Sequence, residues 1–176
     1  MRKEQKANYP ESARVAAALL VRMVLEDGAY TNIALNQYLR GSRLSDLDRR
    51  LATELVYGTV KASGTLDWYL AQCVSRPLDK VAGDILAILR ISTYQLLYMT
   101  RIPASAAVNE AVKLARSVSH EGSAKFVNGV LRGLLRKQEA GAFVLPDAEK
   151  QDADYLSLKY YHPRWLVKRW LGPWGR

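Results

Sequence analysis

The stretch DILAILRISTYQLLYM, residues 84–99, decides the fold. On a helical wheel its apolar side chains point in several directions, because Ile85 and Leu89 share one direction and Leu86 and Leu97 share another. A helix that is apolar nearly all round must be enclosed by other elements on several sides. The stretch is too short, and too often interrupted by polar residues, to cross a bilayer. It therefore predicts the central buried helix of an all-α domain.

Further helices are predicted on both sides of this stretch, and no segment shows the sustained alternation of apolar and polar residues that marks a strand. Ser12 and Ser45 stand where a helix N-cap is expected, and Gly41 and Pro77 follow helical patterns that end there. The other expected helices run from Ser12 to Gly28, over 31–40, from Ser45 to a break at Gly64, and over 65–74, 106–118, 124–138, 152–161 and 163–172.

The composition is that of a globular, basic protein. Hydrophobic residues make up 49% of the 176 residues and the formal net charge is +9, so nucleic acid or an acidic membrane surface is the expected kind of partner. The single cysteine, Cys73, excludes an internal disulfide framework and fits a reducing cytoplasm. The first residues are basic but lack the apolar run of a signal peptide. We therefore expect a cytoplasmic protein without a membrane span.

A row of cations is expected on the outward face of the helix at residues 124–138. Lys125, Arg132 and Arg136 fall within roughly 40° of one another on the wheel, opposite a side made of Val and Leu. Gly129 lies within this row and would let a phosphate approach the backbone. The row predicts a surface that follows an RNA backbone, and an ordinary solvated helix face is the alternative interpretation.

The helix at residues 106–118 could add a second row of polar and charged side chains. Asn109, Lys113 and Arg116 follow the i, i+4 and i+7 spacing that places side chains on one face. The same alternative applies here, because surface Lys and Arg most often serve a solvated face.

No catalytic or metal-binding constellation accompanies these rows. His120 and His162 have no cysteine or second histidine at metal-ligand spacing, and we expect them to cap a helix or lie on the surface. Cys73 has no adjacent base and is interpreted as a small buried hydrophobic residue. Neither G-x-G-x-x-G nor a Walker loop is present. We expect no cofactor and no metal in this chain, and by itself it does not resemble an enzyme.

The C-terminal residues are unusually rich in aromatic side chains. From Tyr155 to Arg176 there are five basic residues, no acidic ones and six aromatics, among them Trp165, Trp170 and Trp174. Such large side chains need a surface that covers them. They either fold back on the bundle or dock on a domain that should follow, since the end of the sequence looks like a stop inside a linker.

Three stretches together resemble a known family: DRRLATELVYGTV at 48–60, ILRISTYQLLYMTRIPASAAVNEAVKLAR at 88–116, and KFVNGVLRGLLR at 125–136. They are similar to the helical domain shared by the antitermination factor NusB and the N-terminal part of RsmB, also called Sun or Fmu. RsmB proteins are ribosomal RNA cytosine-5 methyltransferases. The resemblance covers roughly Ser12 to Lys137 and implies a NusB-like helical bundle that binds RNA.

Two stretches favour the RsmB branch of this resemblance: ELVYGTVKASGTLDWYLAQ at 54–72, and YYHPRWLVKRW at 160–170. The resemblance then implies the RNA-binding N-terminal domain of an S-adenosylmethionine-dependent 16S rRNA methyltransferase. The cofactor and the catalytic residues would belong to a missing domain. Expected partners are ribosomal RNA and that C-terminal methyltransferase domain, with no membrane and no metal. The expected divisions are a basic segment at 1–11, the bundle at 12–138 and a linker at 139–176.

The resemblance also adds Arg14 to the expected RNA contacts, because NusB proteins tend to carry arginines at the start of the first helix. Asn109, Asn128, Tyr57 and Gly58 are assigned to packing. Two other classes of function stay open: a stand-alone NusB-type antitermination module, and a purely structural or dimerising helical module. The complete set of expected RNA-binding residues is Arg14, Lys113, Lys125, Arg132 and Arg136. Three further basic residues, Arg2, Lys3 and Lys6, lie upstream of Arg14 and are not part of this set.

Overall fold

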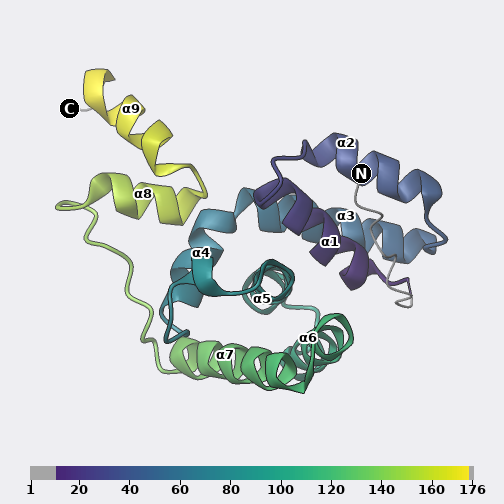
Figure 1. Ribbon diagram of the computed structural model, residues 1–176. Coiled ribbons are helices and arrows are strands. Elements are labelled where there is room, and N and C mark those ends of the chain that lie inside the picture. Colours follow the sequence, from purple (N-terminus) through teal and green to yellow (C-terminus); the bar gives the residue numbers. More distant parts are fainter. Residues whose placement is uncertain (1–10, 175–176) are drawn as a thin grey trace.

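The computed structural model describes residues 11–174, and within this range all regular elements are helices (Figure 1). The basic segment predicted at residues 1–11, with Arg2, Lys3 and Lys6, therefore lies outside the described residues except for Glu11. The all-α prediction is confirmed. The helices are α1 Ala13–Leu25, α2 Thr31–Gly41, α3 Asp46–Lys61, α4 Ser63–Ala71, the 3-10 helix η1 Leu78–Lys80, α5 Gly83–Tyr98, α6 Ala104–Val118, α7 Glu121–Glu139, α8 Asp152–Tyr160 and α9 Arg164–Trp174.

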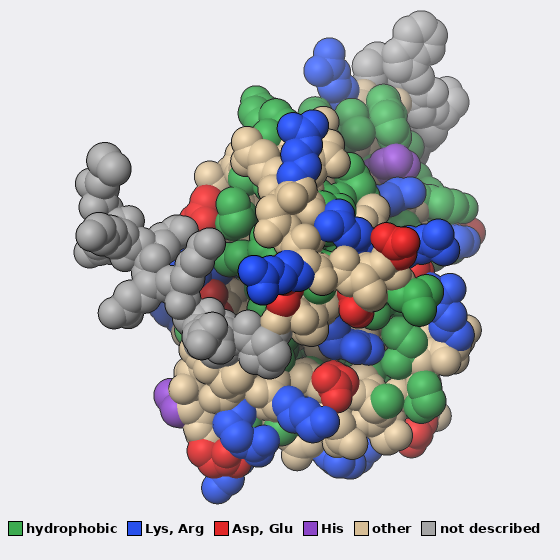
Figure 2. All heavy atoms as spheres, turned by 90° about the vertical axis from the view of Figure 1, so that its right-hand side faces the viewer, with side chains coloured by type: hydrophobic (Ala, Val, Ile, Leu, Met, Phe, Trp, Pro, Cys, Tyr) green, Lys and Arg blue, Asp and Glu red, His purple; other side chains and the backbone are tan. Residues whose placement is uncertain are grey.

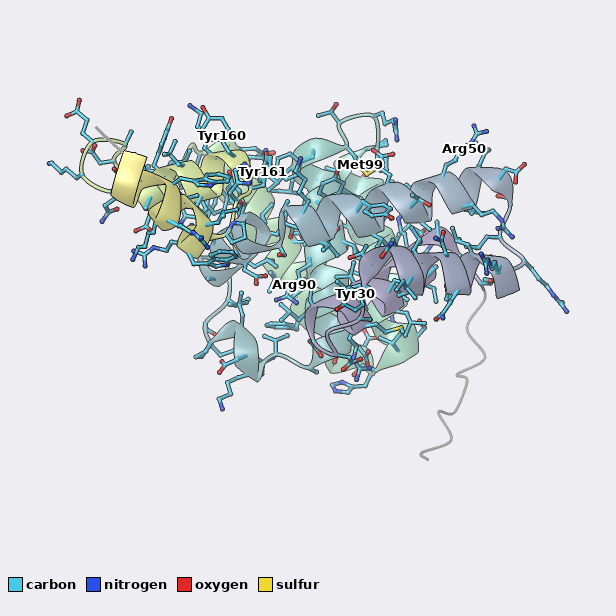
Figure 3. All side chains as sticks on the ribbon, turned by 90° about the horizontal axis from the view of Figure 1, so that it is seen from above. Tyr30, Arg50, Arg90, Met99, Tyr160 and Tyr161 are labelled. Carbon is cyan, nitrogen blue, oxygen red and sulfur yellow. The ribbon has the colours of Figure 1, made fainter. Side chains whose placement is uncertain are left out.

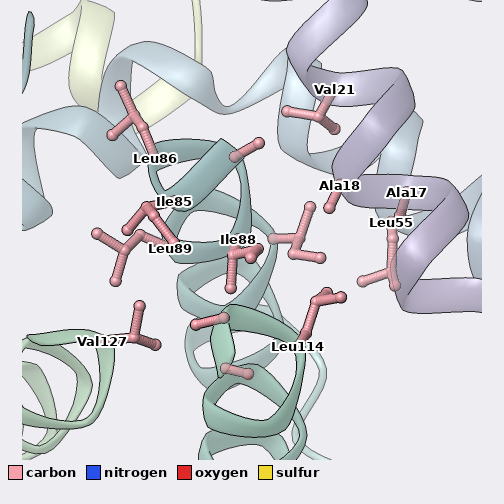
Figure 4. Close-up of a cluster of buried hydrophobic side chains, with 14 of the residues drawn as sticks. Ala17, Ala18, Val21, Leu55, Ile85, Leu86, Ile88, Leu89, Leu114 and Val127 are labelled. Carbon is pink, nitrogen blue, oxygen red and sulfur yellow. The ribbon is translucent and has the colours of Figure 1, made fainter. Parts of the chain in front are cut away.

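Helix α5 is the centre of the bundle, as its sequence predicts. Helices α1, α3, α4, α6 and α7 all pack against it. Nine of its residues are buried, including Ile88 and Leu89 at 1% and 0% exposure. Figure 4 shows these side chains meeting Leu55 of α3, Leu114 of α6 and Val127 of α7. The main core cluster is therefore built by several helices around α5, and a smaller second cluster contains Ala13, Ala16, Leu44 and Ala52.

The expected start signals operate at three helices. The Ser12 side chain accepts a hydrogen bond from the Val15 N–H at 3.3 Å, and Ser45 accepts one from the Asp48 N–H at 3.1 Å. His120 caps α7, because its Nδ1 accepts the Ser123 N–H at 3.3 Å. Side-chain acceptors at these positions satisfy backbone donors that have no partner inside the helix.

The break predicted at Gly64 lies two residues earlier, so that prediction is wrong in detail. Helix α3 ends at Lys61 and α4 starts at Ser63, which places the break at Ala62 and Gly64 in the first turn of α4. Ala62 has φ −89° and ψ 7°. Any residue type can adopt this conformation, and the break therefore needs no glycine.

Gly58 brings α3 close to α5. A Cβ atom at position 58 would lie 2.1 Å from Cζ of Tyr94. The packing role expected of Gly58 is therefore confirmed, since a larger residue would push the Tyr94 ring away. Its neighbour Tyr57 is 46% exposed, so the packing role expected of that residue is wrong.

The C-terminal part of the chain follows α7 through an irregular segment and forms α8 and α9. Helix α8 packs on α4, and α9 packs on α8 (Figure 1). The tail therefore folds back through α8, whereas Trp165 and Trp170 of α9 stay 66% and 51% exposed. The side chain of Trp174 is not among those described. Among the helices of residues 11–174, none combines the length and apolar character that crossing a membrane needs.

Candidate nucleic-acid interface

The outward face of α7 carries the cations that its sequence places there. Lys125, Arg132 and Arg136 are exposed. The opposite face is fixed by side chains that are at most 4% exposed, namely Ala124, Val127, Val130, Leu131 and Leu134. Because one face of the helix is buried so fully, the three cations must point into solvent.

These cations form no ion pair within the described part of the chain, although Lys125 contributes, after Arg116, to the lowered pKa of the Glu121 carboxyl at the start of α7. None of Lys125, Arg132 and Arg136 has a carboxylate oxygen of a described residue within 4.0 Å. The Arg132 Nε donates to Oδ1 of Asn128 at 2.9 Å, which orients the guanidinium without neutralising it. A positively charged row of this kind attracts phosphate groups.

A second edge of this surface comes from the segment after α4, which the sequence analysis missed. The Arg76 guanidinium lies over the Phe126 ring, with its carbon 4.6 Å from the ring centroid. Further along α7, the Lys137 Nζ donates to the carbonyl oxygen of Gln72. Residues 72–76 therefore run beside α7, where they add Arg76 to its flank and hold Lys137 of α7 in place. Only the folded chain reveals these contacts, because they join positions that are far apart in the sequence.

Two glycines separate the cation row from this flank. A Cβ at Gly129 would meet no atom within 4 Å, and one at Gly133 would meet only Arg136 Nη2 at 3.9 Å. Packing therefore does not require glycine at either position, although glycine inside a helix costs about 1 kcal/mol relative to alanine. The two positions leave the helix backbone accessible between basic side chains. We call the whole surface the α7 face: Arg76, Lys125, Gly129, Arg132, Gly133, Arg136 and Lys137.

The second row predicted on α6 is exposed but largely neutralised. Lys113 pairs with Glu110 at 3.1 Å, and Arg116 pairs with Glu121 at 2.6 Å. The hydrogen bond from Arg116 lowers the pKa of the Glu121 carboxyl. Seen from the right-hand side of Figure 1, Lys and Arg are likewise interspersed with Asp and Glu (Figure 2). The cations of α6 are thus poor candidates for phosphate contacts compared with those of α7.

Arg14 does not join the α7 face. Its Nε donates to Oε1 of Gln95 at 3.0 Å, and Gln95, which is 1% exposed, donates in turn to the Ile91 carbonyl. Helix α1 packs on α2, α3 and α5, whereas α7 packs on α4, α5 and α6. The five residues expected to contact RNA therefore do not form one surface. Arg14 satisfies a buried amide of the central helix, as buried polar groups require.

The two asparagines differ from the expectation that both serve packing between helices. Asn109 is exposed on α6. Asn128 is half-buried and holds the Arg132 guanidinium rather than a backbone group. The packing assignment followed from the family resemblance, whereas the i, i+4, i+7 spacing places Asn109 on one face with Lys113 and Arg116, where the structure finds it exposed.

The remaining reactive side chains serve structure. Cys73 packs against the core, and burial raises the pKa of its thiol, which disfavours the thiolate. His162 is exposed and lies edge-on to Trp170, with ring centroids 5.3 Å apart. Among the described residues no group of three or more His, Cys, Asp and Glu could hold a metal ion. Residues 11–174 also contain no strand–loop–helix unit that would fit S-adenosylmethionine.

The model of the NusB family matches residues 11–136, a range that covers α1 to α6 and most of α7. The chain belongs to the NusB family. The NusB match ends within α7, near the C-terminal end of the α7 face, and the predicted resemblance is confirmed.

Two comparisons extend this result beyond the NusB bundle. The chain is 40% identical over 94% of its length to a probable ribosomal RNA small subunit methyltransferase B of Synechocystis, and 37% identical over 92% to that of Bacillus subtilis. It spans only 36% and 35% of the length of these relatives.

Among solved structures, T. maritima NusB matches with TM-score 0.65 and 20% identity, over 74% of this chain and 95% of that one. A NusB–NusE complex with dsRNA matches with TM-score 0.65 and 21% identity, over 70% and 93%. These structures establish the fold.

Proposed function

We propose that this NusB-family chain binds ribosomal RNA through the α7 face. The observation that carries the proposal is the contrast between two neighbouring helices: Lys125, Arg132 and Arg136 of α7 form no ion pair among the described residues, whereas Lys113 and Arg116 of α6 do. Cations without an ion-pair partner, on both sides of an accessible helix backbone, suit a chain of phosphates. The solved NusB complex with dsRNA is consistent with this use of the fold.

We further propose that the domain belongs to an S-adenosylmethionine-dependent 16S rRNA cytosine-5 methyltransferase of the cytoplasm. Identity to relatives named as small subunit methyltransferases B is 37–40%, against 20–21% for two of the NusB structures, which favours the methyltransferase over an antitermination module. The chain covers only 36% and 35% of the length of these relatives. In such a parent the cofactor and the catalytic residues lie outside these 176 residues, and this domain orients the RNA.

The exposed aromatic side of α9 fits the same proposal. Trp165 is 66% exposed although α9 is otherwise anchored by Val167, which is 3% exposed. A large aromatic side chain in solvent marks a surface that another element covers. We assign that element to the methyltransferase domain of the parent, within the division proposed here of bundle 12–138 and linker 139–176.

Salt-dependent RNA binding tests the α7 face. We would measure the affinity of the chain for a small-subunit rRNA fragment by fluorescence anisotropy over a series of salt concentrations. The double variant Arg132→Gln, Arg136→Gln should lower the slope of log K against log salt by about one to two units, because two phosphate contacts are lost. Sequence preference should stay unchanged.

Arg116→Gln is the matched control, since it removes an exposed cation of similar position that is already paired with Glu121. It should change the salt slope far less than the double variant. Because Arg116→Gln removes one charge and the double variant removes two, a loss in Arg116→Gln of half the size or more would show that net charge, rather than the α7 face, determines binding. Unchanged affinity in the double variant would contradict the proposal.

A further inference from the structure

The turn between α8 and α9 has an unusual backbone. Tyr161 ends α8 with φ 59° and ψ 34°, and it is the one non-glycine residue with positive φ among those described. This left-handed conformation normally falls to glycine or asparagine, because a Cβ atom crowds the following carbonyl. A tyrosine persists there only where its surroundings hold it in place.

The side chain of Tyr161 supplies that support, because it rests on the central helix of the bundle. Its ring meets the Tyr98 ring edge-on, with centroids 5.6 Å apart and planes at 83°. Figure 3 places Tyr161 where the tail meets the bundle. Burial, and after it the Tyr161 hydroxyl, raise the pKa of Tyr98, so the Tyr98 hydroxyl stays neutral at physiological pH. One residue thus reverses the chain and contacts α5.

Other contacts make the turn stiff. The Ser157 hydroxyl donates to the His162 carbonyl at 2.6 Å, and the His162 N–H donates to the Ser157 carbonyl at 3.2 Å. Arg164 at the start of α9 forms a two-bond ion pair with Asp154 of α8. Helices α8 and α9 are therefore braced against each other on both sides of Tyr161.

A second contact holds α8 on the bundle. The buried Thr65 hydroxyl donates to the Leu158 carbonyl at 2.9 Å. Tyr161 and Leu158 are close in sequence, so these two contacts restrain the same end of α8. The start of α8 lacks a contact of this kind, since the segment before it touches the bundle mainly through Phe143 on Trp68 and Tyr69.

We propose that Tyr161 is a positioning residue that fixes the direction of α9 relative to the bundle, with its left-handed backbone making the turn and its ring locking the turn onto Tyr98. Whatever docks on α9 is then held at a set angle to the α7 face. That consequence rests on the proposed function, whereas the lock itself is a property of this chain and needs neither RNA nor a further domain.

The distance between spin labels on α3 and α9 tests the lock. In a Cys73→Ala background, labels at Arg50→Cys and Lys168→Cys report how α9 sits relative to the bundle, read by double electron–electron resonance. Tyr161→Gly tolerates the backbone conformation but removes the ring, and should widen the distance distribution about twofold as α9 becomes mobile. Tyr161→Phe retains the ring and should reproduce the parent distribution.

Tyr161→Asn provides a second variant without the ring, since asparagine also accepts the left-handed region. It should widen the distribution as Tyr161→Gly does, while far-UV circular dichroism confirms unchanged helix content. A narrow distribution in both variants, or a broad one in the parent, would overturn the proposal. Because RNA is absent from this measurement, its outcome is independent of whether the α7 face binds RNA.

Discussion

The bundle α1–α7 and the tail α8–α9 differ in how many apolar side chains they bury. In the bundle, helices α1, α3, α4, α6 and α7 pack on α5, and α2 packs on α1 and α3. Large side chains such as Leu55, Leu89 and Leu134 reach 0% exposure. In the tail, Val167 is the one buried apolar residue among the described positions of both helices. The comparison indicates that the bundle is stabilised by its own buried core, whereas the tail is held in place mainly by its contacts with the bundle.

Truncation of a buried side chain in the bundle should show the largest difference in stability between the two regions. Leu89→Ala removes a fully buried side chain from the central helix and should lower the free energy of unfolding by about 3 kcal/mol, through lost burial and the cavity that remains. Leu171→Ala in the half-buried tail should change it far less. Urea unfolding followed by circular dichroism measures both, and similar losses would show that the bundle and the tail form one core.

Alkaline pH should weaken the joint between the two regions. The pKa of Tyr98 is raised from its ordinary value of 10, mainly by burial, and Tyr161, Tyr69 and Tyr94 lie around it. A raised pKa in an acid means that the fold favours the neutral form, so this stability is complete below pH 10 and declines above it. We expect a loss of about 3 °C in Tm between mildly and strongly alkaline solution.

Tyr98→Phe is the control for this pH effect, because it retains the ring and removes the ionisable hydroxyl. Its Tm should decline less over the same alkaline range. The difference between the two Tm curves then gives the contribution of Tyr98 ionisation, separate from that of the other tyrosines and the lysines. If the two curves run parallel, Tyr98 does not cause the alkaline loss.

The smallest effect is expected on the open side of the tail. Trp165→Ala should leave the Tm of the 176-residue chain within about 1 °C, since the exposed side chain contributes little to folding. In a longer polypeptide that includes the proposed methyltransferase domain, the same change should lower Tm measurably. Differential scanning calorimetry of both chains decides this, and a large effect in the short chain would show that Trp165 already packs on the bundle.

The parts of the fold that follow from local pattern were predictable. An all-round apolar run identified α5, and a wheel separated the cations of α7 from its buried face. Arg76 and Lys137 were missed as part of the α7 face because their places depend on the docking of residues 72–76, a tertiary contact. The contact of Arg14 with Gln95 could not be predicted for the same reason, since nothing near Arg14 in the sequence indicates the buried amide of Gln95. Helical periodicity predicts the direction in which a side chain points, whereas the residue that it contacts depends on how the helices pack in the folded protein.

The close approach of α3 and α5 at Gly58 also has an evolutionary consequence. The Tyr94 ring occupies the space that a side chain at position 58 would fill, so the two positions share one volume. A sequence that gains a larger residue at 58 must give up the ring at 94, or the helices must separate. We therefore expect positions 58 and 94 to change together among relatives, with glycine retained wherever an aromatic ring faces it.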